Sequence, residues 1–134
     1  MKAAMLDTDM LSEFLRGNPN VLKNVEKYLD EYGIINISVI TYYEIQNGLL
    51  YKDARKQLSK FEDFVELNNI IPLTTPMAHK AAEIQAYLRK KGIQIGHTDT
   101  LIAGIAITNK LQLITNNTGH FKRVKGLDFD NWTK

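Results

Sequence analysis

The chain has 134 residues, of which 44% are hydrophobic and 24% are charged, and this length and composition predict one globular domain with a substantial core. It has no cysteine, which excludes disulfide bonds, thiolate metal sites and cysteine nucleophiles, and its net charge of +2 is too small to indicate nucleic-acid binding by itself. The apolar part of the N-terminal segment is too short for a signal peptide and no apolar run is long enough to span a membrane, so we expect a cytoplasmic protein without membrane association.

The first half of the chain alternates short apolar segments, typical of buried strands, with longer amphipathic segments, typical of helices. Strands are predicted at residues 2–6, 34–37 and 70–73, and helices at 9–16, 19–31, 39–50 and 54–67. Gly17 and Gly33 are predicted to end the first two helices, because glycine readily adopts the left-handed conformation at a helix end. Asn18 and Ser38 are expected to cap the second and third helices.

The second half continues the same alternation. A helix follows Thr75-Pro76 and ends at Gly92, Thr98 is expected to cap a helix at residues 99–109, and strands are predicted at 111–114 and near 127–129. Residues 101–107 are apolar on all sides, which indicates a central, buried helix. The alternation predicts an α/β fold of three layers, with a central, mostly parallel sheet of four or five strands flanked by helices.

Three carboxylates stand in segments that otherwise carry no charge: Asp7, Glu44 and Asp99. Asp7 ends the first strand, whereas Glu44 and Asp99 lie in early turns of predicted helices. Parallel sheets bind ligands beyond the carboxyl ends of their strands, so the topology can bring these acids together. Acids in one apolar neighbourhood repel each other, and a hard cation such as Mg²⁺ relieves that repulsion. The pattern therefore suggests a metal-dependent site for phosphate chemistry.

Each of these acids also has a purely structural interpretation. Asp7 can be a turn residue at the end of a strand, and Asp9 stands where a helix N-cap is needed, with a supporting role beside the metal as the alternative. Glu44 can form a capping box with Thr41. Asp99 can simply favour the positive end of its helix.

Other polar residues near these segments are ambiguous. Asn117 can offer a carbonyl oxygen to a metal or belong to an Asx turn. The histidines do not form a metal-ligand pattern, and each is expected to be a surface or packing residue: His79, His97 and His120. His97 is the most interesting because it lies two residues before Asp99. The basic segments 89–91 and 122–125 are solvated faces or, for the second, phosphate contacts.

Four motifs occur in an order that fills the whole chain: residues 5–9, 38–44, 96–103 and 113–121, followed by 123–127 and 131–132. Together they resemble the PIN-domain ribonucleases, and within them the VapC-type toxins of bacterial toxin–antitoxin pairs. The resemblance implies a PIN-like fold with Asp7 and Asp99 as ligands of Mg²⁺ or Mn²⁺ and Glu44 as the third acid. Asn117 stands where the family often has a fourth acid, and Asp9 where Asn or Ser is more usual.

The resemblance further implies a Mg²⁺-dependent endoribonuclease toxin that cleaves structured RNA such as tRNA, with a VapB-like antitoxin as partner and a homodimeric assembly. Candidate antitoxin contacts on the early helices are Leu11, Phe14, Leu15, Tyr42 and Tyr51. Two rival interpretations remain. One is a degenerate PIN domain that binds without catalysis; the other is a haloacid-dehalogenase-type phosphatase, suggested by Asp7-Thr8-Asp9 after a strand.

Overall fold

A computed structural model describes residues 1–134 as an α/β fold around a parallel sheet. The strands are β1 (Ala4–Leu6), β2 (Asn36–Ser38), β3 (Asn69–Ile71), β4 (Gln112–Ile114) and β5 (Phe129–Asp130). They form one five-stranded sheet in the order β3-β2-β1-β4-β5, with every neighbouring pair parallel. The predicted parallel α/β sheet is confirmed, and β1 lies at its centre, where Leu6 is in register with Ile37 and Ile114.

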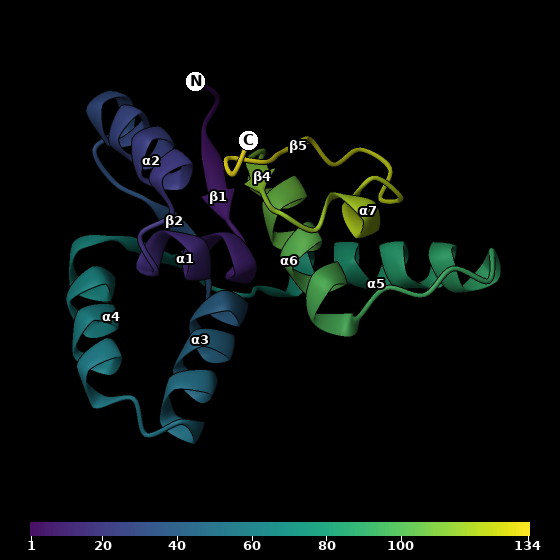
Figure 1. Cartoon of the computed structure of the whole chain (residues 1–134). Helices are drawn as coiled ribbons and strands as arrows, with labels where there is room; N and C mark the ends of the chain where they lie inside the picture. Colours follow the sequence, from purple (N-terminus) through teal and green to yellow (C-terminus); the bar gives the residue numbers. More distant parts are fainter.

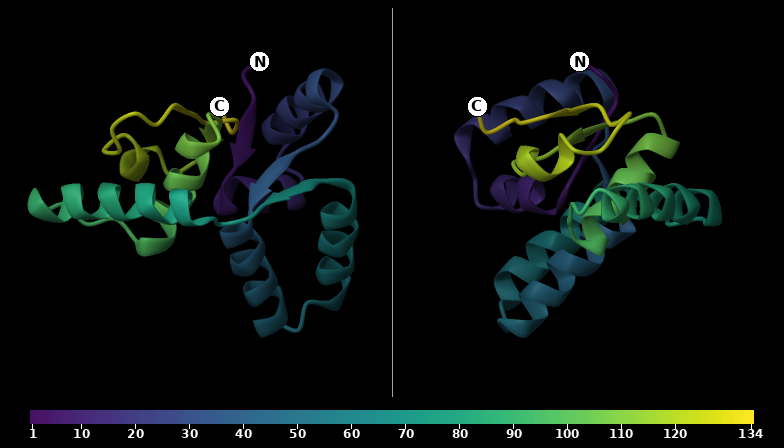
Figure 2. Two further views of the ribbon diagram at one scale, coloured as in Figure 1. Left: turned by 180° about the vertical axis from the view of Figure 1, so that it is seen from behind. Right: turned by 90° about the vertical axis from the view of Figure 1, so that its right-hand side faces the viewer.

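Seven helices connect and cover the strands (Figure 1). They are α1 (Thr8–Leu15), α2 (Pro19–Tyr32), α3 (Val39–Tyr51), α4 (Arg55–Leu67), α5 (Thr75–Lys90), α6 (His97–Thr108) and α7 (Thr118–Phe121). Figure 2 shows that α3 and α4 form a hairpin that extends away from the sheet in one direction, while α5 extends in another. None of the helices is both long and apolar enough to cross a membrane.

Two apolar cores lie on the two faces of the sheet. Along β1 the side chains alternate, so that Ala4 and Leu6 pack in one core and Met5 packs in the other. The first core joins the sheet to α1–α4 and includes Trp132 near the C-terminus, whose ring lies 5.9 Å from that of Tyr28. The second core contains α5, α6 and α7. This arrangement gives the three layers that the sequence predicts.

The helices α5 and α6 pack closely because α6 carries Gly104. A Cβ atom built at Gly104 would lie 2.7 Å from the carbonyl oxygen of Met77 and 2.9 Å from the amide nitrogen of Ala81. The predicted burial of α6 is confirmed, since residues 102–106 are all buried. Gly104 is therefore required by the contact between the two helices.

Several predicted helix ends are confirmed. Asn18 accepts hydrogen bonds from the amides of Asn20 and Val21, and Ser38 accepts one from the amide of Thr41. Gly17 and Gly33, which follow α1 and α2, have φ angles of +83° and +77°, so the backbone there is left-handed.

Other predicted ends are wrong by one or two residues. The cap of α1 is Asp7 rather than Asp9, because the side chain of Asp7 accepts the amide of Met10. The helix α6 begins at His97, so Thr98 lies inside it, and its cap residue Gly96 offers no side chain. The one-turn helix α7 was not predicted. It has only four residues, too few to show a helical period.

Candidate active site

The carboxyl ends of β1 and β4 border a pocket that contains all four candidate residues, with a volume of about 360 Å³. It is lined by Asp7, Thr8, Asp9, Ser12, Arg16, Glu44, Asp99, Ile102 and Asn117. A cavity of about 460 Å³ at the opposite, amino edge of the sheet has Asp128 as its only acid, and Lys2 pairs with this acid at 2.8 Å. The concentration of four acids, Asp7, Asp9, Glu44 and Asp99, therefore identifies the pocket at the carboxyl edge as the candidate site.

Asp7 lies at the floor of this pocket and is 5% exposed. Its amide donates to the carbonyl of Ile114 at 3.0 Å, which continues the β1–β4 ladder, and its Oδ1 accepts the Met10 amide at 3.0 Å. Burial, and then the neighbouring Asp9, raise the pKa of the Asp7 carboxyl to about 9, while hydrogen bonds from Thr115 and Met10 partly oppose this rise. One side chain thus both caps α1 and faces the site.

Asp9 lies inside α1 and serves neither as a cap nor as an isolated surface acid. Its Oδ1 accepts the backbone amide of Asn116 at 3.2 Å, and Asn116 in turn accepts hydrogen bonds from Asn131 and Thr133. Asp9 therefore connects α1 to the loop after β4 and to the C-terminal segment. The capping interpretation of Asp9 is wrong, and a supporting position beside the other acids is what the structure shows.

Glu44 points from α3 toward the first turn of α1. Its Oε1 accepts a hydrogen bond from Thr8 Oγ1 at 2.6 Å, and Thr8 Oγ1 also lies 3.1 Å from Thr41 Oγ1. The capping-box interpretation is wrong, because Ser38 is the cap and Thr41 is already the third residue of the helix. The second oxygen of Glu44 takes no hydrogen bond and is available to a ligand.

Asp99, in the first turn of α6, contacts His120, which the sequence predicts to be only a surface or packing residue. His120 Nδ1 lies 3.0 Å from Asp99 Oδ2 and 2.9 Å from Asn117 Nδ2. One ring nitrogen can donate or accept but not both, so only one of these contacts is a hydrogen bond in a given tautomer. The oxygen of the Asn117 amide takes no hydrogen bond. Asn117 directly precedes α7, but its side chain makes no capping hydrogen bond, so the Asx-turn interpretation is wrong, whereas Asn117 does line the acidic pocket.

Two features of the pocket differ from what the sequence suggested. His97, the histidine singled out by its closeness to Asp99, lines a separate cavity between α5 and α6 instead of the acidic pocket. Arg16 also lines the acidic pocket, and the sequence did not suggest this. It lies just after α1 and forms an ion pair with Glu13. The one signal for His120 was its place three residues after Asn117 in the fourth motif.

The acids of the pocket are not gathered into a group of three that could hold a metal ion as they stand. Each is held by a separate protein partner: the Met10 amide for Asp7, Thr8 for Glu44 and His120 for Asp99. Four carboxylates line the pocket with only one cation, Arg16. The electrostatic field of the pocket is consequently negative and favours a cationic ligand.

The fold and this acidic pocket define a nuclease-like α/β domain, and comparison with known proteins gives the family. Residues 4–127 match the PIN domain family, and the chain belongs to it. The resemblance drawn from the motifs is thereby confirmed. PIN-domain nucleases of the VapC type generally depend on a divalent metal.

Within this family, the chain is similar to proteins named VapC. The chain is 33% identical over 97% of its length to ribonuclease VapC2 of Rickettsia felis, covering 98% of that protein. It is 29% identical over 96% of its length to the tRNA(fMet)-specific endonuclease VapC of Shigella flexneri, covering 97% of it. The crystal structure of VapBC2 from Rickettsia felis bound to a promoter DNA fragment superposes with a TM-score of 0.87 at 31% identity, over 97% of this chain and 98% of that one.

Proposed function

We propose that this protein is a Mg²⁺-dependent endoribonuclease of the VapC type and the toxin of a toxin–antitoxin pair. One observation carries the proposal: Asp7, Glu44, Asp99 and Asn117, which are far apart in the sequence, line a single pocket at the carboxyl edge of a PIN-domain sheet. The relatives named as ribonucleases over nearly the full length support the same activity.

The residues of the pocket fit a hard divalent cation by their chemistry. All candidate ligands are oxygen donors, as Mg²⁺ prefers, and Glu44 and Asn117 each keep an oxygen free of hydrogen bonds. Asp7 and Asp99 would hold the ion, with Glu44 as the third acid, directly or through water. Mn²⁺ has similar requirements and should substitute for it. When bound, the ion supplies positive charge that neutralises the phosphate and acidifies water.

The other side chains of the pocket would activate the attacking water and hold the acids in position. Glu44, fixed by Thr8, is placed to orient the attacking water and accept its proton. His120 holds Asp99 from the α7 side. Asp9 fixes the loop after β4 through the Asn116 amide. These contacts join residues of α1, α3, α6 and α7 into one rigid wall, which is what in-line attack on a phosphodiester requires.

We further propose that the substrate is structured RNA cut in an unpaired loop, such as the anticodon loop of a tRNA. Sequence-specific RNA recognition mostly targets unpaired bases, which can be splayed out and contacted individually. A relative that covers nearly the whole chain is named as a tRNA(fMet)-specific endonuclease. Sequencing RNA ends after brief induction in cells would identify the target.

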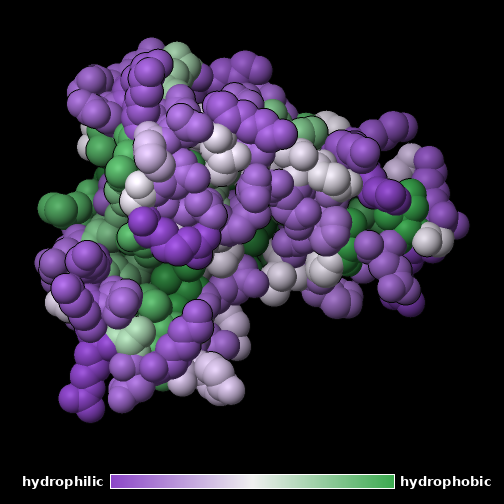
Figure 3. Space-filling model, viewed as in Figure 1, coloured by the Kyte–Doolittle hydropathy of each residue, from purple (hydrophilic) through white to green (hydrophobic).

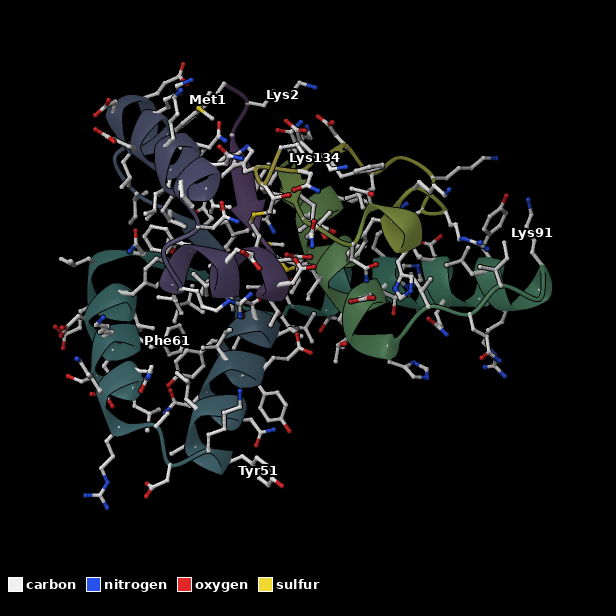
Figure 4. The ribbon with its side chains drawn as sticks, in the orientation of Figure 1. Met1, Lys2, Tyr51, Phe61, Lys91 and Lys134 are labelled. Atoms are coloured by element: carbon white, nitrogen blue, oxygen red, sulfur yellow. The ribbon has the colours of Figure 1, made fainter.

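The antitoxin partner is expected to bind an apolar surface between α1, α3 and α4. Figure 3 shows hydrophobic side chains exposed below α1 in this region. Phe14, Leu15 and Tyr42 are half-buried against the first core there, and Tyr51 at the end of α3 is 90% exposed. Leu11 was expected to join them, but it is completely buried and cannot contact a partner. Figure 4 shows Phe61 of α4 directed into the space between α3 and α4.

The solved complexes support such a partner, since relatives crystallised as VapBC and FitAB assemblies. An Arg or Lys side chain from the flexible C-terminal arm of a VapB-like antitoxin would match the negative pocket, which lies next to the apolar surface at α1. We expect growth arrest when this chain is expressed alone, and relief when the antitoxin is co-expressed. A wild-type chain that is harmless at high expression would contradict the toxin proposal.

We also infer a homodimer. Ala82 and Ala86 are exposed on α5, beside a cavity of about 390 Å³ at the start of α6. The side-chain oxygen of Gln85 in the same cavity is buried without a hydrogen-bond partner. Pairing of this face with a second copy would cover the alanines and can satisfy Gln85. Light scattering on the purified chain would give the mass, and a monomer at all concentrations would contradict the inference.

The direct test of the enzymatic proposal is Asp99→Asn. This change removes one negative charge but keeps the size of the side chain, so we expect cleavage of RNA to be abolished while the fold survives. Glu66→Gln on the exposed surface of α4 is the matched control and should keep full activity. Wild-type turnover by Asp99→Asn in saturating Mg²⁺ would refute the ligand assignment. Wild-type protein that binds RNA without cutting it would favour the non-catalytic alternative.

The phosphatase interpretation loses its basis in this structure. That interpretation needs the second acid of Asp7-Thr8-Asp9 free to act beside the first. Asp9 instead holds the amide of Asn116, and the chain belongs to the PIN domain family.

A further inference from the structure

A second polar groove lies outside the acidic pocket, between the C-terminal half of α5 and the segment that follows α7. It has a volume of about 240 Å³ and is lined by Lys80, Glu83, Ile84, Tyr87, Leu88, Arg123, Val124 and Lys125. Figure 1 shows α7 and the following loop lying alongside α5, and Figure 4 labels Lys91 at the end of this helix. We call this site the Tyr87 groove.

The positive charges of the Tyr87 groove are not neutralised by neighbouring acids. None of Lys80, Arg123 and Lys125 has a carboxylate within 4.0 Å, whereas ion pairs occur elsewhere on the surface. The single acid of the groove is Glu83, whose Oε1 lies 3.6 Å from His79 Nε2. The groove therefore carries a net positive charge that suits an anionic ligand.

The ring of Tyr87 contacts two cations from different parts of the chain, Lys91 and Lys125. Lys91 Nζ lies 4.6 Å from the centroid of the Tyr87 ring and Lys125 Nζ lies 5.7 Å from it, both within the range of cation–π attraction. The same ammonium groups, Lys91 first, lower the pKa of the Tyr87 phenol against the opposing effect of desolvation. Two flexible lysines are thus held near one point instead of spreading into solvent.

The Tyr87 groove is coupled to the acidic pocket through a short, anchored segment. His120, which contacts Asp99, precedes Arg123 by three residues, so their backbones are at most about 11 Å apart. Phe121 and Val124 are buried and fix this segment against the second core. A few nucleotides of an extended strand can span such a distance.

We propose that the Tyr87 groove binds a backbone phosphate of the RNA on one side of the scissile bond. Arg123 and Lys125 contact the phosphate, and the face of the Tyr87 ring holds Lys125 near it. The proposal rests on the proposed ribonuclease function and adds to it a separate anchoring site for the strand. The negative acidic pocket repels phosphates, so an anchor outside it raises the affinity for a polyanion.

The test compares two double variants. Arg123→Gln with Lys125→Gln removes two charges from the groove, and Lys56→Gln with Lys60→Gln removes two exposed charges from α4 as the matched control. Binding of an unpaired RNA oligonucleotide of about a dozen residues is measured against salt concentration in EDTA, which prevents cleavage. The slope of log K against log salt should fall by about 0.7 in the groove variant, the value for one lost phosphate contact on a single strand, and stay constant in the control.

Cleavage of a long and a very short RNA in Mg²⁺ completes the experiment. The groove variant should lose about tenfold in kcat/KM on the long RNA and nothing on a dinucleotide, whose single phosphate is the scissile one and leaves none for the groove. Equal salt slopes for the two double variants, or an equal loss on both RNAs, would overturn the proposal. If the wild type cuts no RNA while its salt slope still depends on Arg123 and Lys125, the ribonuclease proposal fails and the groove assignment stands.

Discussion

Thr8 and Glu44 are joined by a 2.6 Å hydrogen bond from Thr8 Oγ1 to Glu44 Oε1, across the junction of α1 and α3. Thr8 directly follows the buried Asp7, so this bond places Glu44 beside the first acid of the pocket. Thr41 supports Thr8 from the other side, with the two hydroxyl oxygens 3.1 Å apart. Two residues without charge thereby fix the position of a charged one.

This contact predicts a role for the Thr8 hydroxyl in turnover. Thr8→Val keeps the shape of the side chain but removes the hydrogen bond, and hydrogen bonds to charged groups contribute about 1.5–3 kcal/mol. We expect kcat for RNA cleavage to fall by about tenfold or more, and the melting temperature to fall as well, because the same bond joins α1 to α3. Thr8→Ser retains the hydroxyl and should stay near wild type. Equal kcat values for the valine and serine variants would refute this role.

The environment of Asp7 predicts how stability without metal depends on pH. Its pKa is raised from 3.8 to about 9 on folding, so between these values the folded state binds more protons than the unfolded chain, and stability falls as the pH rises. Asp7→Asn removes this penalty and keeps an Oδ1 for the Met10 amide. In EDTA at pH 8 we expect the variant to be more stable than wild type by about 1 kcal/mol or more.

Thermal unfolding at several pH values measures this effect. The difference between Asp7→Asn and wild type should nearly vanish around pH 4 and grow toward pH 9, and Mg²⁺ should stabilise the wild type alone. A difference that does not change with pH would show that Asp7 is not held protonated by its surroundings.

The position of Asn117 in the acidic pocket predicts that a substitution there changes how many metal ions bind. If it occupies the position of a fourth acid, Asn117→Asp adds a carboxylate to the pocket and should tighten Mn²⁺ binding or admit a second ion. Calorimetry of Mn²⁺ binding to both forms compares affinity and stoichiometry directly. Identical values would place Asn117 outside the metal shell.

The contact between His120 and Asp99 predicts that this histidine, and not His97, supports activity. His120→Ala removes the partner of Asp99 Oδ2, and a hydrogen bond of about 0.5–1.5 kcal/mol corresponds to a loss of roughly 2- to 10-fold in kcat. His97→Ala is the matched control, because His97 is exposed and lines a different cavity. Full activity in the His120 variant, or an equal loss in both, would contradict this assignment.

Gly104 provides a test of the packing between α5 and α6. Gly104→Ala places a methyl group 2.7 Å from the Met77 carbonyl oxygen, and such overpacking costs about 1–3 kcal/mol of unfolding free energy. Gly48→Ala, inside α3 with open space around it, should instead stabilise the protein by about 0.4–1 kcal/mol. Urea unfolding of both variants measures the two changes. A stabilised Gly104 variant would mean that the helices can separate at little cost.

The sequence was sufficient for most of the fold because the relevant signals are local. The helical stripe of Met77, Ala81, Ile84 and Leu88, the caps at Asn18 and Ser38, and the apolar strands each depend on neighbours a few residues away. The short helix α7 escaped prediction because one turn carries too little periodicity. Asp9 and Thr98 were misplaced as caps because several polar residues stand near each helix start, and only the backbone path selects among them.

Asp7, Glu44 and Asp99 each stand in a segment without other charges, and this also pointed to a shared site, since acids are rarely buried without a partner. Which residues complete that site was decided only by the tertiary structure. His120 reaches Asp99, and Thr8 reaches Glu44, across 21 and 36 positions of sequence. The raised pKa of Asp7 likewise arises because the folded chain surrounds its carboxyl and excludes water. Such contacts and such desolvation depend on how helices and strands pack together, and no local pattern of residues encodes them.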